Sequence, residues 1–278
     1  MPSSVFSIKI CNVYAICDRQ ETVYMSELEK ISFEEESEEI KDKVISYWTK
    51  RSESFSEQRH DEIHSYKRQL WQAEFLRYFS KEDKLSVLDV GCGTGYFEMV
   101  LSDFACQVTG IDLTPDMIER GRDLLKRHDS SAKLMVMDAE HPDFPDESFD
   151  VVVSRNLTWT LPHPIEAYKE WQRVLKPGGI LLIYDAEYAK GFHHYNQEDN
   201  LAHKKVSESM DRECHEIYHM LTISSLDRPQ WDKEVLAGLG FENIETDLGA
   251  GDRLYGEKDE FYMPDRMFLI KAQKSGEN

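Results

Sequence analysis

Between residues 85 and 185, short apolar segments alternate with amphipathic ones, and this alternation constrains the fold more than any other feature of the sequence. Helical periodicity is clearest at residues 115–127 and 164–175. The apolar runs have the length and texture of strands buried on both faces, and they lie at residues 85–90, 107–111, 133–137, 149–154 and 180–184. Strands that alternate with helices form a parallel sheet with helices on both faces. The sequence therefore predicts an α/β domain.

The flanking regions carry different patterns. Residues 37–84 predict a helical lid of two helices, capped by Ser37 and Ser56 and joined by a polar loop at residues 50–58. Residues 186–230 are polar and rich in His and Tyr, and they predict a helical cap inserted over the site. Residues 231–278 predict one helix and the last two strands. We treat residues 1–36 as an N-terminal extension, either disordered or a short strand, and residues 37–278 as one domain with its core at 85–185.

Composition excludes several classes of function. The chain has 278 residues and a net charge of −20, so it repels phosphate backbones and anionic lipid, and neither nucleic acid nor a membrane is an expected partner. No apolar run approaches the roughly 18–20 residues of a membrane span. Five cysteines without a CxxC pair are typical of a reduced protein, and we expect a cytoplasmic monomer or homodimer.

The strongest local signal is a glycine-rich turn, VLDVGCGTG at residues 87–95, where a strand ends and a helix begins. Such a turn brings backbone N–H groups close to a ligand. A dinucleotide site has the spacing G-x-G-x-x-G, whereas here Tyr96 stands where the third glycine belongs. Asp89, two residues before the first glycine, would repel a pyrophosphate and attract an ammonium. The turn therefore favours an amino-acid-like ligand over a dinucleotide.

A second carboxylate follows the next predicted strand. Asp112 lies about 20 residues past the turn, where an acid accepts both hydroxyls of a ribose. The alternative is that Asp112 caps the helix at 115–127, with Thr114 as the competing cap.

Four segments in order resemble the motifs of class I S-adenosylmethionine-dependent methyltransferases. They are VLDVGCGTG, GIDLTPDMI, MDAEHPDFPDESFDVVVSRN and VLKPGGILLI, and the resemblance covers roughly residues 47–186. It implies a Rossmann-like, seven-stranded, mostly parallel sheet whose last strand, expected at 261–272, runs antiparallel. It also implies S-adenosyl-L-methionine as cofactor, S-adenosyl-L-homocysteine as its product, and a small-molecule acceptor.

The resemblance assigns roles to individual residues. Asp89 and the turn should hold the methionine part of the cofactor, Asp112 the ribose, Asp138 the adenine amino group, and Asn156 should lie between cofactor and acceptor. The full expected set of cofactor contacts is Tyr47, Arg51, Asp89, Gly91, Cys92, Gly93, Thr94, Gly95, Asp112, Leu113, Met117, Asp138, Ala139, Asn156 and Leu157.

The acceptor contacts are less constrained. Tyr47, Trp48, Arg51 and Phe55 resemble a lid segment of small-molecule members, although plain core packing explains Tyr47 and Trp48 equally well. Arg51 can meet a carboxylate of cofactor or acceptor. Methyl transfer from a sulfonium needs a base only if the acceptor must lose a proton. The candidates for such a base are Tyr188, His193 and His194.

Three alternatives remain beside the leading hypothesis. His215 and His219 share a helix face at a spacing that can bind a transition metal, but no third ligand is evident, and we expect no metal. An NAD-dependent oxidoreductase would share the fold and the ribose carboxylate. A regulatory module that holds the cofactor without transferring a methyl group would share all four motifs.

Overall fold

The computed structural model describes residues 27–188, 201 and 206–276. The chain divides into two compact parts, residues 1–38 and 39–278, and the following concerns the second. Helix α1 (Glu27–His64) crosses this boundary and supplies the first helical segment of the larger part.

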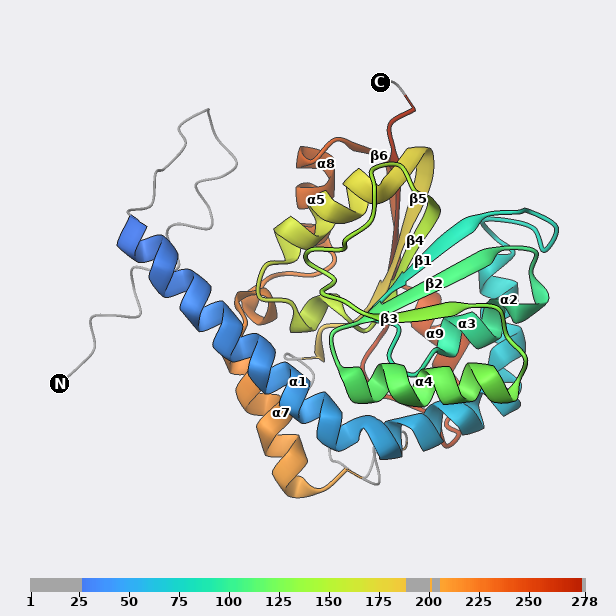
Figure 1. Cartoon of the computed structure of the whole chain (residues 1–278), viewed down its shortest axis with the longest axis horizontal. Helices are drawn as coiled ribbons and strands as arrows, with labels where there is room; N and C mark the ends of the chain where they lie inside the picture. Colours follow the sequence, from blue (N-terminus) through green and yellow to red (C-terminus); the bar gives the residue numbers. More distant parts are fainter. Residues whose placement is uncertain (1–26, 189–200, 202–205, 277–278) are drawn as a thin grey trace. The chain divides into compact units, whose positions relative to one another are not determined.

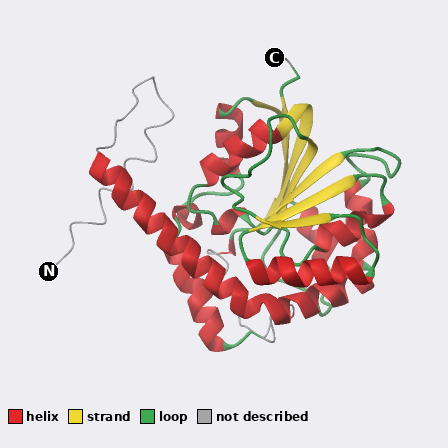
Figure 2. Ribbon diagram, viewed as in Figure 1, coloured by secondary structure: helices red, strands yellow, loops and turns green. Residues whose placement is uncertain are grey.

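Seven strands form one sheet in the order β3-β2-β1-β4-β5-β7-β6 (Figures 1 and 2). Neighbours among β1 to β5 run parallel, while β7 is antiparallel to both β5 and β6. The predicted α/β, Rossmann-like fold and its antiparallel last strand are confirmed. The strands are β1 (Ser86–Val90), β2 (Gln107–Asp112), β3 (Lys133–Val136), β4 (Phe149–Arg155), β5 (Leu175–Asp185), β6 (Phe241–Asp247) and β7 (Phe268–Lys274).

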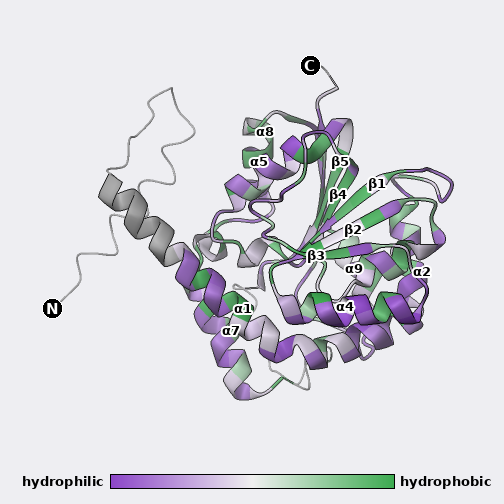
Figure 3. Cartoon of the chain, in the orientation of Figure 1, coloured by the Kyte–Doolittle hydropathy of each residue, from purple (hydrophilic) through white to green (hydrophobic). Residues whose placement is uncertain are grey.

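Side chains of each central strand alternate between two buried layers, which is why the strands are apolar throughout (Figure 3). In β1, Val87 faces one layer and Leu88 the other. The first layer contains α2 (Lys67–Phe75), α3 (Tyr96–Val100), α4 (Pro115–Arg127) and α9 (Ala250–Tyr255). The second contains α5 (Pro164–Val174) and α8 (Gln230–Gly238). Helix α7 (Glu208–Met220) packs instead on α1.

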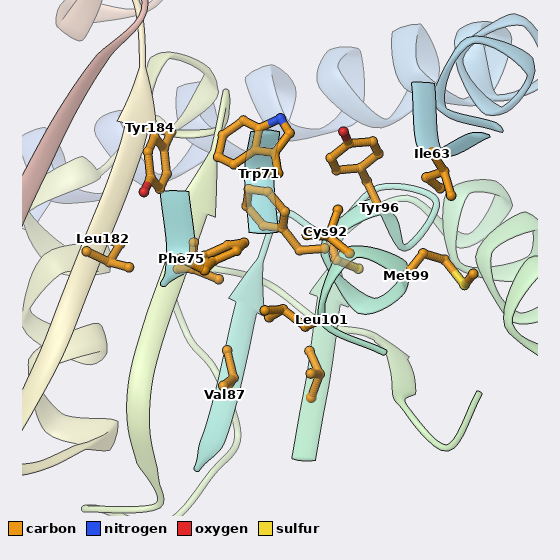
Figure 4. Close-up of a cluster of buried hydrophobic side chains, with 14 of the residues drawn as sticks. Ile63, Trp71, Phe75, Val87, Cys92, Tyr96, Met99, Leu101, Leu182 and Tyr184 are labelled. Carbon is orange, nitrogen blue, oxygen red and sulfur yellow. The ribbon is translucent and has the colours of Figure 1, made fainter. Parts of the chain in front are cut away.

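An aromatic cluster anchors α2 to the sheet (Figure 4). Trp71 and Phe75 are fully buried, and the Trp71 ring lies edge-on to Phe97 and Tyr184, with centroids 4.8 and 4.9 Å apart. The Trp71 indole N–H donates to the Tyr255 hydroxyl at 2.9 Å. Because edge-to-face rings stabilise beyond their buried area, this cluster fixes the chain that follows α1.

Two predicted boundaries are wrong. Residues 50–58 are not a loop but the interior of α1, so Ser37 and Ser56 do not start helices. The segment has no Gly or Pro, and Arg51 and Ser52 are buried, so nothing in it ends a helix. The last strand begins at Phe268 rather than at residue 261. Pro264 lacks the N–H that a strand paired on both sides must donate.

Candidate active site

The cavity of interest lies at the carboxyl ends of the parallel strands and has a volume of about 350 Å³. After β1 the chain moves outward to β2 and β3, then crosses back to β4 and β5 on the other side. Ligands of open α/β sheets bind at such a reversal. The strand order therefore places the cavity where residues from β1, β2 and β4 converge.

The glycine turn forms the cavity floor beside β1. Gly91, Gly93 and Gly95 adopt φ of 72°, 54° and 82°, in the left-handed region. A Cβ on Gly91 would lie 2.7 Å from Leu157, and one on Gly93 would lie 3.3 Å from Phe55. The turn is thus a close-fitting backbone cradle that side chains would fill.

Asp112 is bound to this turn. One carboxylate oxygen accepts from the Gly93 N–H at 2.9 Å, and the other accepts from the Thr114 N–H at 2.8 Å. Neither Asp112 nor Thr114 caps α4 with its side chain, so helix capping does not account for the acid. Burial raises the pKa of Asp112, although the two N–H bonds oppose that shift.

Two further carboxylates are buried under the turn. Asp89 is 2% exposed, and burial together with the charge of Glu98 raises its pKa well above the usual range. Both oxygens of Glu98 are buried with no hydrogen-bond partner in the described chain, and burial raises its pKa to about 8. Glu98 fills the space that Gly110 leaves, since a Cβ there would lie 2.1 Å from its oxygen. No sequence pattern signalled this residue.

Lys41 from α1 closes the end of the cavity next to β3. Its Nζ pairs with Asp138 at 2.7 Å and with Glu140 at 2.7 Å. Glu140 also accepts from the His163 N–H at 2.5 Å. Burial lowers the pKa of Lys41, but its two carboxylate partners outweigh burial, and the net shift is upward. Lys41 and Glu140 were not predicted, because nothing in sequence links residue 41 to residue 138.

A buried ionic cluster joins α1 to β4. The Glu62 carboxylate pairs with Arg59 and with Arg155, the latter at 3.1 Å, and it accepts from the Tyr255 hydroxyl. The Arg155 guanidinium also lies 4.5 Å above the Tyr96 ring. Arg59 and Arg155 line the cavity. Sequence reasoning missed this cluster, although Arg59 and Glu62 are three residues apart on one helix.

Aromatic side chains surround the opposite end, over β4 and β5. The Trp159 ring contacts those of Tyr188 and Tyr218, with centroids 5.5 and 4.6 Å apart. The Tyr188 hydroxyl donates to the Asn156 side-chain oxygen at 2.7 Å, and Asn156 has a left-handed φ of 55°.

Asp185 at the end of β5 holds this aromatic end in place. It accepts from the Trp159 backbone N–H at 3.2 Å and pairs with Arg228 at 3.0 Å. Arg228 is buried and also pairs with Asp232.

Most of the predicted site residues meet at this cavity, and two of the cofactor set do not. The residues that line it are Tyr47, Arg51, Asp89, Gly91, Cys92, Gly93, Asp112, Leu113, Met117, Asp138, Ala139, Asn156, Leu157 and Tyr188. Thr94 is buried behind the turn against Gly121, and Gly95 starts α3. Tyr47 lines the cavity and also packs in a cluster with residues of α7, so core packing accounts for part of its surroundings, and its contact with a ligand stays a prediction.

The histidine candidates contribute little to the described cavity. His193 and His194 lie outside the described residues. The rings of His215 and His219 on α7 meet edge to face with centroids 4.3 Å apart, and neither residue lines the cavity. Among the described residues, no three metal-ligating side chains gather in a cluster.

None of the helices in the described ranges combines the length and the apolar character that crossing a bilayer requires.

Sequence comparison connects this geometry to known proteins. Residues 88–183 match the family model of a methyltransferase domain. The chain is 44% identical over 101 residues to 2-methyl-6-phytyl-1,4-hydroquinone methyltransferase of Synechocystis sp., which covers 36% of this chain and 31% of that protein. It is 30% identical over 154 residues to demethylmenaquinone methyltransferase of Listeria welshimeri, covering 54% and 64%. The matches thus span 31% and 64% of the lengths of these two relatives.

Solved structures share the fold. Phosphoethanolamine N-methyltransferase 2 of Haemonchus contortus, in complex with S-adenosyl-L-methionine, aligns with a TM-score of 0.52 at 20% identity, covering 73% of this chain and 51% of that one. A SAM-dependent methyltransferase from Aquifex aeolicus aligns with a TM-score of 0.50 at 16% identity, covering 73% and 89%.

Proposed function

Because the chain carries a methyltransferase domain of the class I, S-adenosylmethionine-dependent type, we propose that it transfers a methyl group from S-adenosyl-L-methionine to a small-molecule acceptor. The observation that carries the proposal is the Asp112 carboxylate, which is hydrogen-bonded to Gly93 N–H and so stands beside the glycine cradle. This arrangement suits an adenosyl amino acid, whose ribose and amino-acid parts are both polar and adjacent.

The residues along the sheet edge fit the parts of this cofactor in order. Asp138 and Ala139 after β3 would contact adenine, with Leu113 and Met117 against its ring. Asp112, the last residue of β2, would accept the ribose hydroxyls. Asp89 in β1 and the Gly91–Gly93 backbone after that strand would hold the methionine part. Asn156 and Leu157 after β4 would border the sulfonium.

The ionic cluster supplies one further cofactor contact. Arg59 and Arg155 share the single Glu62 carboxylate, so one positive charge is left over at the cavity wall. Phe55, one helical turn before Arg59, lies over Gly93. Arg59 is therefore placed to meet the carboxylate of the methionine part, and Arg51, about two helical turns earlier on α1, lines the same cavity.

The chemistry asks little of the protein beyond placement. When bound, the cofactor supplies an activated methyl group for an in-line displacement. The chain's own residues orient that group, exclude water with Trp159 and Leu157, and hold the acceptor opposite the leaving sulfur. Tyr188 and the histidines 193 and 194 stay candidates for a base that removes a proton from the acceptor.

Titration calorimetry tests the proposal. S-adenosyl-L-homocysteine should bind the full chain and NADH should not. Asp112→Asn should weaken binding of S-adenosyl-L-homocysteine about tenfold or more, because charged acceptors make stronger hydrogen bonds than amides. Asp123→Asn, an exposed acid on α4, should bind like the unaltered protein. Binding of NADH alone would refute the proposal, and formation of S-adenosyl-L-homocysteine on adding a metabolite extract would separate an enzyme from a regulatory module.

We also propose a cytoplasmic monomer or homodimer that does not act on nucleic acid. The acidic net charge supports this choice of substrate. The thiols of Cys92, Cys106 and Cys214 are free, which suits a reducing compartment. Size-exclusion chromatography with light scattering would give the oligomeric state.

A further inference from the structure

One carboxylate of the cavity is not needed by the proposed cofactor. Asp265 is half-buried and lines the cavity, and no ion pair neutralises it among the salt bridges of the described residues. It precedes β7 by three residues. Because Phe268 of β7 pairs antiparallel with Asp185 of β5, the start of β7 lies at the same edge as the end of β5. Asp265 therefore reaches the cavity from the side farthest from β2 and β3.

The surroundings of Asp265 are aromatic. Its charge acts on the hydroxyls of Tyr188 and Tyr218, whose pKa values are raised mainly by burial and further by this carboxylate. Trp159 packs against both rings. The Tyr188 hydroxyl already donates its hydrogen bond to Asn156. A ligand in the cavity would therefore contact the ring of Tyr188 rather than its hydroxyl. Met263 lines the same part of the wall.

The charge balance of this end is unusual. Burial raises the pKa of Asp265 to about 6, so the group is ionised at neutral pH. Arg155 and Arg59 are engaged by Glu62, and Arg51 and Asp211 line the cavity from α1 and α7. An ionised carboxylate partly removed from water is costly unless a cation meets it. Aromatic faces attract the same kind of charge.

We propose that Asp265, together with the rings of Trp159, Tyr188 and Tyr218, binds a positively charged nitrogen of the methyl acceptor as an anchoring group, so that the acceptor is an amine whose cationic nitrogen holds it in place and is not itself the atom that attacks the methyl group. The inference rests on the proposed function, since it assigns the acceptor end of a cavity whose other end takes the cofactor. An anionic acceptor is the competing outcome, because the cation Arg51 also lines the cavity.

The test uses three probes of similar size and different charge: benzylamine, benzyl alcohol and benzoate. Each is titrated into the full chain saturated with S-adenosyl-L-homocysteine. Benzylamine should bind at least about tenfold more tightly than benzyl alcohol, and benzoate more weakly still. Asp265→Asn should abolish the preference for benzylamine without changing the affinity for S-adenosyl-L-homocysteine. Glu260→Gln, an exposed acid of the same segment, should retain the preference.

Several outcomes would overturn the inference. They are equal or tighter binding of benzyl alcohol or benzoate, a preference that survives Asp265→Asn, and absence of saturable benzylamine binding to the loaded protein. In each case intact binding of S-adenosyl-L-homocysteine would leave the proposed function standing, whereas loss of that binding would refute both.

Discussion

The carboxylate of Glu62 on α1 lies 3.1 Å from the guanidinium of Arg155 at the end of β4. Both groups are buried, and Arg59 shares the same carboxylate. A helix that precedes the sheet in sequence is thereby tied to the last residue of β4, directly before Asn156.

Removing this carboxylate should be strongly destabilising. Glu62→Gln leaves two buried guanidinium groups without a counter-charge, which costs about 3–5 kcal/mol in the free energy of unfolding. Urea denaturation followed by circular dichroism measures the change. Glu53→Gln, an exposed acid on the same helix, should shift stability by less than about 0.5 kcal/mol. Equal stability of the two variants would contradict a structural role for the cluster.

Glu98 should make the folded protein less stable as pH rises. Its pKa is raised by burial from 4.5 to about 8 in the folded chain. The folded state therefore holds a proton that the unfolded state loses, and stability is lost progressively as pH rises from about 4.5 to about 8. Glu98→Gln keeps the shape and removes the ionisation. The free energy of unfolding of the variant should therefore increase relative to that of the unaltered protein as pH rises. At pH 8 this relative increase should exceed about 1 kcal/mol.

The matching measurement is a series of urea midpoints between pH 5 and pH 8. A constant difference between the two proteins across this range would show that folding does not raise the pKa of Glu98.

Alanine substitutions at Gly91 and Gly178 separate the effect of backbone strain from the effect of steric overlap with neighbouring side chains. Both have a similar left-handed φ, 72° and 76°, but a Cβ on Gly91 meets Leu157 at 2.7 Å while one on Gly178 meets nothing within 4 Å. Gly178→Ala should lower the free energy of unfolding by about 1 kcal/mol through backbone strain alone. Gly91→Ala should lower it further, and it should also weaken binding of S-adenosyl-L-homocysteine, which calorimetry measures. An unchanged affinity in Gly91→Ala would remove the turn from the binding site.

Lys41 should act on the cofactor through Asp138. Lys41→Met removes the charge that orients the two carboxylates at the β3 end. We expect the affinity for S-adenosyl-L-homocysteine to fall about three- to tenfold, because Asp138 is then no longer fixed toward the adenine amino group. Lys43→Met, whose exposed partner is Glu39, is the control. S-inosylhomocysteine lacks that amino group, so its affinity should not depend on Lys41. An equal loss of affinity for S-inosylhomocysteine in Lys41→Met would show that Lys41 does not act through Asp138 and the amino group.

The sequence predicts the sheet well because each central strand is buried on both faces, and burial leaves a nearly continuous apolar run. That Asp89, Asp112 and Asp138 meet at one cavity was also predictable, because Asp89 lies near the end of β1, Asp112 ends β2 and Asp138 follows β3, all at the same edge of the sheet. Residues 50–58 were misassigned because serine and glutamate suit a loop and an exposed helix equally. Only the packing of Arg51 and Ser52 decides between the two.

Residues that act through partners distant in sequence were not accessible. Lys41 meets Asp138 across 97 positions, and Glu62 meets Arg155 across 93. Glu98 carries no pattern at all, because a glutamate in a short helix after a glycine turn is ordinarily exposed. Asp265 was hidden inside a segment that we had assigned to the last strand.

The antiparallel course of β7 separates two kinds of change. Every expected cofactor contact precedes residue 158, whereas Asp265 lies near the end of the chain, just before β7. Because β7 runs antiparallel to β5, its first residue lies beside the last residue of β5, and Asp265 thereby reaches the cavity. Substitutions in that late segment can therefore change the proposed acceptor end of the cavity while every expected cofactor contact stays unaltered. On this proposal, one short stretch of chain would set the choice of acceptor independently of the choice of cofactor.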